Sequence, residues 1–113
     1  MARRNQAHAY TLDQYKELRN QPAVVIFFTA TWCGPCRTMY GDFERLKSQY
    51  PEILFVKIDV DASPEVNDYC VIQAMPTFMF YLHGKKQKDL RFKGADIQQL
   101  MTNCCELASR LDG

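Results

Sequence analysis

The feature with the clearest chemistry is a pair of cysteines, Cys33 and Cys36, separated by two residues. An apolar run at 24–28 precedes the pair, and residues 37–50 after it have the pattern of a helix. Positions i and i+3 in a first helical turn have Cα atoms about 5–6 Å apart, a distance that a disulfide can bridge. The free N–H groups and the dipole of a helix N-terminus stabilise a thiolate there. The sequence therefore predicts a redox-active dithiol, with Cys33 as the nucleophile and Cys36 as the resolving thiol.

Two other uses of such a pair have to be weighed against redox chemistry. Half of a zinc site would need a second pair of ligands at compatible spacing, and the chain has no second Cys-x-x-Cys and no His-x₃₋₅-His. We therefore predict no metal site. A structural disulfide stays open as an alternative, although Gly34 and Pro35, between strand and helix, suit a bond that opens and closes. Pro35 also fits a first turn, because its missing N–H would have had no helical partner.

Three motifs give the chain a resemblance to the thioredoxin family. Residues 30–36 (Ala-Thr-Trp-Cys-Gly-Pro-Cys) match the active-site motif of that family, residues 74–78 (Ala-Met-Pro-Thr-Phe) its cis-proline loop, and residues 92–95 (Phe-Lys-Gly-Ala) its glycine loop. The motifs occur in the family's order and spacing, so the resemblance extends over nearly the whole chain. It implies an α/β thioredoxin fold, with a mixed central β-sheet flanked by about four helices, in a single domain of residues 1–113.

The resemblance also implies a substrate groove around the cysteine pair. Trp32 would shield the sulfurs and offer an apolar lip to partner proteins, where the plainer interpretation is a core aromatic residue. A cis bond before Pro76 would leave the Met75 backbone N–H and C=O free to pair with an extended substrate segment. Gly94 and Ala95 would form a third wall of the groove, where their small size lets a partner approach closely. The substrate-binding residues implied in this way are Trp32, Gly34, Pro35, Met75, Pro76, Gly94 and Ala95.

One position close to the chemistry departs from the family pattern. The family usually carries a buried aspartate six positions before the first active cysteine, held to assist proton transfer at the resolving cysteine, and this chain has Phe27 there. Lys57 matches a lysine that accompanies the aspartate in some members. Without that acid, Lys57 has to reach water, pair with Asp59 or Asp61, or become neutral. We expect Phe27 and Lys57 to tune the resolving step, which should accelerate as pH rises and more thiolate forms.

The remaining cysteines are Cys70, Cys104 and Cys105. Cys70 falls at the end of a short predicted helix, where the first interpretation is a small apolar residue. A regulatory or dimer-linking disulfide is the sharper hypothesis. Cys104 lies on the apolar stripe of the last helix, which predicts an inert core position. A disulfide between Cys104 and its neighbour Cys105 would conflict with helical geometry, so neither receives a catalytic role.

The elements that position these motifs follow from capping signals and apolar periodicity. Thr11 and Gln14 form a capping-box pattern ahead of a helix near 12–19. The almost continuous apolar run 23–29 predicts a central strand covered on both faces. Ser63 is expected to cap a short helix that begins at Pro64. The other predicted elements are an edge strand at 7–10, the long helix after the cysteine pair, a strand at 53–60, a hairpin of 77–82 with 88–93, and a last helix capped by Asp96 with an apolar stripe of Ile97, Leu100, Met101, Cys104, Ala108 and Leu111.

Composition limits the class of protein, its partners and its expected location. With 47% apolar and 24% charged residues, the chain has the make-up of an ordinary globular domain, and a formal charge of +1 gives no case for nucleic acid or an anionic membrane as partner. No apolar run approaches membrane-spanning length. Arg3 and Arg4 are not followed by the apolar segment of a signal peptide, so none is expected here. Five cysteines, an odd number, argue against a disulfide-stapled secreted scaffold, so a cytoplasmic location is expected. We expect a monomer, with an oxidised dimer through Cys70 as the exception.

The resulting functional hypothesis is a thiol–disulfide oxidoreductase that reduces disulfides in other proteins. The resemblance implies that NADPH supplies the electrons through a thioredoxin reductase, and that no bound cofactor is needed. The alternative is a thioredoxin-fold binding module that docks partners in a redox-dependent way without efficient turnover. The presence of Phe27 in place of the family's buried acid favours this alternative. An oxidase or isomerase is the weaker rival, because such relatives commonly carry a histidine between the cysteines.

Overall fold

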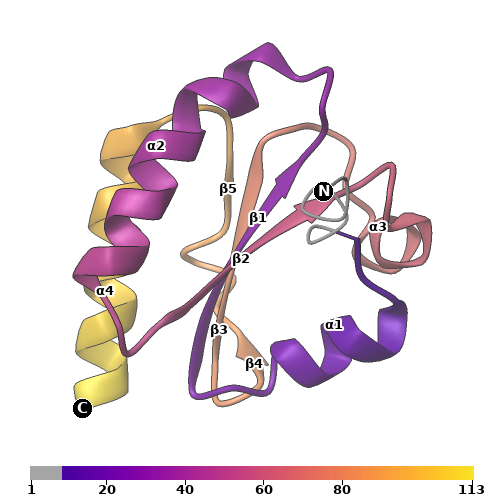
Figure 1. Ribbon diagram of the computed structural model, residues 1–113. Coiled ribbons are helices and arrows are strands. Elements are labelled where there is room, and N and C mark those ends of the chain that lie inside the picture. The colour runs from indigo at the N-terminus through magenta and orange to yellow at the C-terminus, as the bar shows by residue number, and fades with distance from the viewer. Residues whose placement is uncertain (1–8) are drawn as a thin grey trace.

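The computed structural model describes residues 9–113, which form a mixed β-sheet with helices on both of its faces (Figure 1). In chain order the elements are α1 (Leu12–Leu18), β1 (Ala23–Thr29), α2 (Gly34–Gln49), β2 (Leu54–Asp59), α3 (Pro64–Cys70), β3 (Thr77–Leu82), β4 (Lys85–Lys86), β5 (Phe92–Lys93) and α4 (Ile97–Asp112). Helices α2 and α4 pack together on one side of the sheet, and α1 and α3 on the other. The α/β class and the four helices agree with the prediction from sequence.

Strand β1 is the centre of the sheet, whose order is β2-β1-β3-β4 with β5 also paired to β3. It runs parallel to β2 and antiparallel to β3. All seven of its side chains are buried, because helices cover both faces. This is the environment that its unbroken run of β-branched and aromatic residues predicts.

The N-terminal elements confirm one predicted cap and correct two other predictions. The Thr11 hydroxyl accepts a hydrogen bond from the Gln14 N–H, and the Gln14 side chain accepts one from the Thr11 N–H, so the capping box is present. Of the predicted edge strand 7–10, residues 7 and 8 lie outside the described residues, and 9–10 are not a strand. Ser63 does occupy the N-cap of α3, but its hydroxyl makes no cap bond to that helix and instead accepts the Tyr10 N–H at 2.9 Å.

The predicted strand 88–93 is wrong in extent. The chain reverses at His83–Gly84, whose positive φ angles of 50° and 82° suit a tight two-residue hairpin. It then pairs with β3 over the two residues of β4 and leaves the sheet. Residues 88–90 then form a turn that inserts Leu90 into the core before the chain pairs again as β5. Burial of Leu90, whose carbonyl accepts a 2.6 Å hydrogen bond from the Asn103 side chain, therefore interrupts what the pattern predicted as one strand.

Helix α4 buries a somewhat different set of residues from the predicted stripe. Asp96 caps it as expected, its carboxylate accepting the Gln99 N–H at 3.0 Å. Met101, predicted inside, is 39% exposed, whereas Asn103 and Leu107, which were not predicted, are buried. The helix is rotated so that Asn103 meets the inserted 88–90 turn, and this rotation turns Met101 outward.

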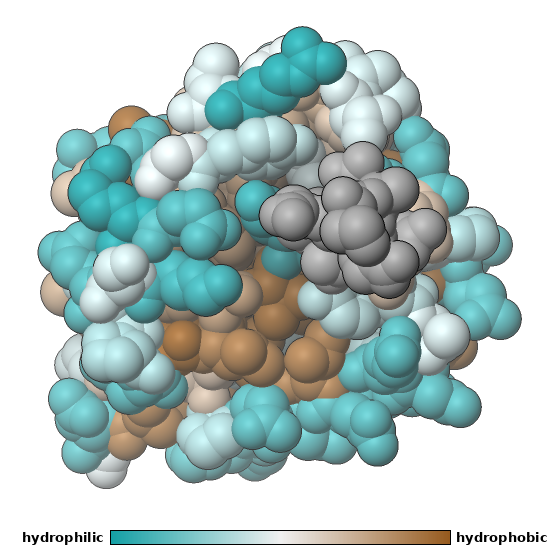
Figure 2. Space-filling model, in the orientation of Figure 1, coloured by the Kyte–Doolittle hydropathy of each residue, from teal (hydrophilic) through white to brown (hydrophobic). Residues whose placement is uncertain are grey.

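The surface over edge strand β2 is less polar than its surroundings. In Figure 2, hydrophilic residues cover most of this face and hydrophobic surface gathers at its centre. Leu54 of β2 is among the large apolar residues that the described structure leaves exposed. Two shallow hollows flank the strand, one beside Leu18 and Leu54 and one beside Phe43 and Phe55, and Tyr10 lines both.

A backbone feature at the end of α3 leads to a stability prediction. Val71, the C-cap residue, has φ 55° and ψ 55°, a left-handed conformation that is unfavourable for a β-branched residue. Its side chain is 62% exposed, so it gains little from packing. Val71→Gly should therefore stabilise the fold by about 1 kcal/mol, a rise of roughly 4 °C in melting temperature, measured calorimetrically.

Val71→Ala is the matched control for that substitution. Alanine removes the branched side chain but keeps the Cβ that disfavours the left-handed region, so its gain should be smaller. A glycine variant that melts below the alanine variant would contradict this account of the strain.

Candidate active site

Four segments that are distant in sequence meet at one end of the sheet. Strand β1 ends at Thr29, just before the cysteine pair, and its parallel neighbour β2 ends beside it at Asp59. Strand β3 runs antiparallel, so that it begins here, with Thr77 paired to Phe28 on β1 and to Lys93 on β5. Register alone therefore brings the cysteine pair, the 60–62 loop, the cis-proline loop and the glycine loop to a common edge.

The cysteine pair occupies the start of α2 in the disulfide form. Cys33 is the N-cap, with extended backbone angles, and its sulfur accepts the Cys36 N–H at 3.2 Å. The Cα atoms are 5.3 Å apart, as the i, i+3 spacing predicts. Cys33 is 4% exposed and Cys36 fully buried, so Cys33 is the sulfur that a partner can reach. A sulfur held by the first N–H groups of a 16-residue helix is placed where an anion is stabilised.

Trp32 lies over the site rather than in the core. It is 63% exposed, and its indole N–H donates a 2.8 Å hydrogen bond to Asp61. The Arg37 guanidinium donates a hydrogen bond to the carbonyl of Thr31, the residue before Trp32, at 2.8 Å. The interpretation of Trp32 as a lip thus fits its position. This anchoring role of Asp61 was not predicted from the sequence, although its place soon after a strand that ends at the site was a usable signal.

The cis-proline and glycine loops are joined by a hydrogen bond. The Met75–Pro76 peptide bond is cis, and the Pro76 carbonyl accepts the Gly94 N–H at 2.9 Å. Gly94 has φ 104°, a conformation that a side chain would strain, which explains glycine at this point. Met75 is half-buried and Ala95 exposed beside them. Gly34 and Pro35 are exposed in the first turn of α2, so all the implied groove residues lie near this edge of the sheet.

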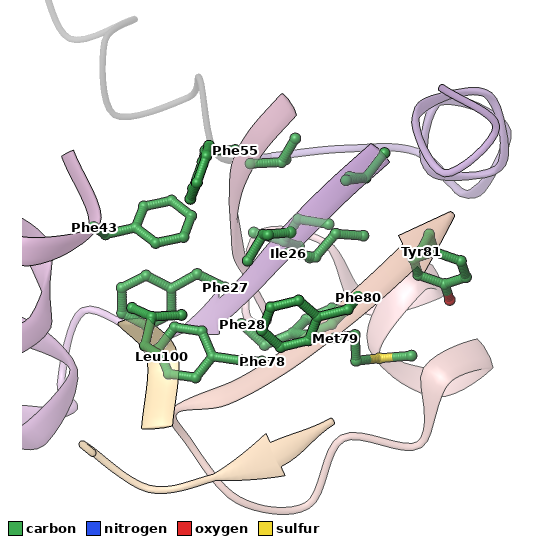
Figure 3. Close-up of a cluster of buried hydrophobic side chains, with 14 of the residues drawn as sticks. Ile26, Phe27, Phe28, Phe43, Phe55, Phe78, Met79, Phe80, Tyr81 and Leu100 are labelled. Carbon is green, nitrogen blue, oxygen red and sulfur yellow. The ribbon is translucent and has the colours of Figure 1, made fainter. Parts of the chain in front are cut away.

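Phe27 fills its position with an aromatic core instead of an acid. It is fully buried, and its ring lies 4.7 Å from the Phe78 ring, 5.1 Å from Phe43 and 5.7 Å from Tyr40, measured between centroids. Figure 3 shows Phe27 between Phe43 and Phe78. The residue is therefore a structural part of the core beneath the redox pair.

Lys57, paired with Phe27 in the register of the sheet, has a partner on α2 that was not predicted from the sequence. Its ammonium lies 3.6 Å from the Glu44 carboxylate and 4.7 Å from the centroid of the Tyr40 ring. Asp59, expected as one partner, instead accepts the N–H groups of Asp61 and Ala62. Of the three alternatives given for Lys57, pairing with Asp59 or Asp61 is not the one observed, because its side chain extends toward Glu44 of α2.

Cys70 sits at the end of α3 and faces α1. The residue is half-buried at the end of this helix, and the hydroxyl of Tyr15 on α1 pairs with the hydroxyl of Tyr81. Burial raises the pKa of the Cys70 thiol, which reduces its thiolate fraction at neutral pH. The contacts agree with the structural interpretation of Cys70, and its dimer-linking role stays a prediction.

The neighbouring cysteines of α4 have opposite environments. Cys104 is fully buried and Cys105 exposed, and both are free thiols. Burial, with a smaller contribution from Cys105, raises the pKa of Cys104 to about 12. The expectation that Cys104 is an unreactive core residue agrees with this environment.

The raised pKa of Cys104 has a consequence for stability at alkaline pH. The unfolded chain loses this proton near pH 9 and the folded protein only near pH 12, so the folded state binds more protons between them. The contribution of Cys104 is therefore fully present below pH 9 and falls by up to about 1.4 kcal/mol per pH unit above it. Urea unfolding with excess reductant measures how much the free energy of unfolding falls between pH 8 and pH 10. This fall should be smaller for Cys104→Ala than for wild type. Cys105→Ala, the matched control, should keep most of the wild-type loss, because burial is the larger cause of the raised pKa. Equal losses in all three proteins would contradict the assignment.

The histidine that the structure describes lies away from the site. His83 lies in the hairpin turn at the opposite end of β3, and His8 is outside the described residues. Among residues 9–113, no three His, Cys, Asp or Glu side chains gather as a metal ion would require. Within the same range, no helix has both the length and the apolar character needed to cross a membrane.

Comparison with known proteins identifies relatives of the whole arrangement. Residues 6–105 match the Thioredoxin family model. The thioredoxin domain-containing protein 8 of Rattus norvegicus is 32% identical over 120 residues, which covers 86% of this chain and 94% of the relative. A thioredoxin of Ictalurus punctatus is 48% identical over 79 residues, covering 68% of this chain and 72% of the relative.

Solved structures give the same result for the fold. Mitochondrial thioredoxin 3 of Saccharomyces cerevisiae, in its oxidised form, superposes with a TM-score of 0.81 at 37% identity, covering 86% of this chain and 91% of the yeast chain. The thioredoxin of Fasciola hepatica gives a TM-score of 0.80 at 34% identity, with 86% and 94% covered. With its bonded Cys33–Cys36 pair at a helix N-terminus beside a cis-proline, this chain belongs to the thioredoxin family of thiol–disulfide oxidoreductases.

Proposed function

We propose that this protein is a protein disulfide reductase that maintains the redox state of cysteines in other proteins through its Cys-Gly-Pro-Cys dithiol. The Cys33 thiolate attacks a substrate disulfide, one substrate sulfur leaves, and a mixed disulfide forms. Cys36 then attacks the Cys33 sulfur, the second substrate sulfur leaves, and the Cys33–Cys36 disulfide remains. Two electrons pass from the dithiol to the substrate in each cycle.

The observation that carries the proposal is the position of the Cys33 sulfur. It caps α2, accepts the Cys36 N–H and is the less buried sulfur of the pair. A helix N-terminus favours the thiolate, and only the thiolate attacks a disulfide. The exposed Trp32 beside it and the cis-proline loop provide apolar and backbone contacts for an extended segment of a partner.

The cycle closes only if the disulfide is reduced again. We assign this step to a thioredoxin reductase that draws electrons from NADPH, because the family relationship implies it and the mechanism needs no cofactor bound to this chain. Disulfide-containing proteins are the proposed substrates. A related solved chain, 34% identical with a TM-score of 0.80, comes from work on thiol resolution in a yeast mitochondrial 1-Cys peroxiredoxin through glutathione and thioredoxin systems.

A coupled turnover assay separates this function from a redox-dependent binding module. Insulin reduction, driven by NADPH and a thioredoxin reductase, should proceed through many cycles per molecule of this protein. A binding module would instead reduce at most one equivalent of disulfide while still capturing partners in one redox state. Phe27 at the family's acid position is the observation that favours the module.

We propose a reducing compartment, the cytosol, as the working location. Three free thiols, one of them exposed, accompany the redox pair, and such thiols persist where glutathione and thioredoxin systems keep them reduced. Relatives include a mitochondrial thioredoxin, so fractionation of cells that express the full chain tests this assignment.

The dimer-linking role of Cys70 provides a further prediction. Cys70 is half-buried at the end of a short helix, so an intermolecular disulfide should form slowly under oxidation and leave turnover of the monomer unaffected. Non-reducing gels should show an oxidised dimer for wild type and for Cys105→Ser, but little for Cys70→Ser. An undiminished dimer band in Cys70→Ser would reject the role.

A further inference from the structure

A hydroxyl pair lies beneath the first turn of α2, at the end of β1. Tyr40 Oη and Thr29 Oγ1 are 3.0 Å apart, with Thr29 buried and Tyr40 half-buried. A buried hydroxyl is costly without a partner, so this contact fixes the direction of the Tyr40 side chain. The pair therefore joins the helix that carries Cys36 to the strand that leads into the active site.

Tyr40 lies on the Cys36 side of this helix. It is four residues after Cys36, so their Cβ atoms are neighbours on one helix face, about 5–6 Å apart. Side chains of a helix lean toward its N-terminus, and the bond to Thr29 shows that Tyr40 does so. Thr29 itself is only four residues before Cys33. The phenol hydroxyl is thus held on the helix side that carries Cys36, against the end of the strand that leads to Cys33.

Cys36 needs such a group because it is fully buried in a largely apolar setting. It must lose a proton before it attacks Cys33, and apolar burial disfavours the thiolate. Phe27, at the position where the family carries an acid, supplies an aromatic ring that packs against Tyr40 and no group that could accept a proton. The Tyr40 hydroxyl is the titratable group one helical turn away.

The charged groups around Tyr40 are occupied elsewhere. On β2, Lys57 lies over the Tyr40 ring face and pairs with Glu44, and Asp59, opposite Thr29 in the register, accepts two loop N–H groups. Arg37 of α2 is directed to the Thr31 carbonyl, and Asp61 holds Trp32. Glu44 is eight residues from Cys36, about 12 Å along the helix.

We propose that Tyr40 is the relay residue that removes the proton of Cys36, with Thr29 orienting its hydroxyl; this rests on the proposed reductase function. In the mixed disulfide, the Cys36 Sγ–H proton passes to Tyr40 Oη, while Tyr40, which is only half-buried, releases its own hydroxyl proton to a water molecule. Cys36 Sγ then bonds to Cys33 Sγ, the bond from Cys33 to the substrate sulfur breaks, and that sulfur leaves as a thiolate.

Single-turnover kinetics of Tyr40→Phe test the relay. The substitution removes only the hydroxyl and keeps the ring that packs on Phe27 and carries the Lys57 contact. Reduced protein is mixed with less than one equivalent of dithio-bis-nitrobenzoate, which releases one coloured thiolate when Cys33 attacks and a second when Cys36 resolves the adduct. This leaving group needs no proton, so the second phase reports on activation of Cys36 alone.

The expected result is a second phase at least tenfold slower at pH 7 in Tyr40→Phe, at the low end of the roughly 10²–10⁴-fold typical of positioned acid–base groups, with the gap closing near pH 10. Thr29→Ser should keep the wild-type profile and Thr29→Val should slow the second phase. Tyr50→Phe, at the far end of α2, is the matched control and should change neither phase.

Three results would overturn the relay: a second phase equal to wild type at every pH, a gap that persists at every pH, or equal slowing of both phases. The last two would assign Tyr40 a structural role. If Tyr40→Phe does not fold, the contrast between the two Thr29 variants decides, and equal profiles refute the relay. Failure of the reductase function would appear separately, as absence of insulin reduction, because the nitrobenzoate reaction needs neither reductase nor protein substrate.

Discussion

Replacing Cys33 with serine is expected to reduce disulfide reduction to the rate of the uncatalysed exchange. The sulfur that caps α2 is the only one of the pair with solvent access, and a serine hydroxyl at the same place stays protonated at neutral pH. Cys36, fully buried behind it, cannot take over the attack on a protein disulfide. Insulin reduction coupled to NADPH oxidation measures this loss.

Cys36→Ser is the informative companion to that variant. It leaves the nucleophile intact but removes the resolving thiol, so one attack takes place and the mixed disulfide accumulates. Mass spectrometry of the trapped adduct should find the partner bonded to Cys33. A partner attached at Cys36 in the otherwise unmutated pair would overturn the assignment of roles.

The second large effect is expected from Phe27→Asp. Phe27 is fully buried on the central strand, with the rings of Phe43, Phe78 and Tyr40 around it. Truncation of a buried phenylalanine costs on the order of 3–5 kcal/mol, and an unpaired buried acid adds to that. Since domains of this size are stable by only about 5–15 kcal/mol, the variant should lose most of its stability in urea unfolding. Lys57, the cross-strand neighbour, would moderate the loss by pairing with the new acid.

Phe27→Leu is the control, because it keeps an apolar side chain and should cost only about 1–2 kcal/mol. If Phe27→Asp folds, the new carboxylate should also accelerate resolution by Cys36 at neutral pH. Without an acid at position 27, attack by Cys36 on the mixed disulfide should be slow at neutral pH and faster at higher pH. A wild-type rate that does not change with pH across neutrality would contradict this expectation. If the resolution rate of Tyr40→Phe then rises steeply with pH while that of wild type does not, Tyr40 is the group that replaces the acid.

The sequence determined the features that depend on residues close together in the chain. The i, i+3 spacing of Cys33 and Cys36, the caps at Thr11 and Asp96, and the apolar run of β1 all appear where predicted, since a helical turn, a cap or a strand is set by its own residues. The cis bond before Pro76 was implied by the family motif and is present.

Tertiary structure decided which side chains from different elements come within a few ångströms of one another. Lys57 pairs with Glu44 rather than Asp59, Tyr40 meets Thr29, and Trp32 is held by Asp61. These contacts depend on the register of β1 against β2 and on the rotation of α2 over the sheet, neither of which a local pattern contains. The same reason explains the outward Met101 and the break between β4 and β5, because burial of Leu90 and Asn103 is settled only when α4 packs on the completed sheet.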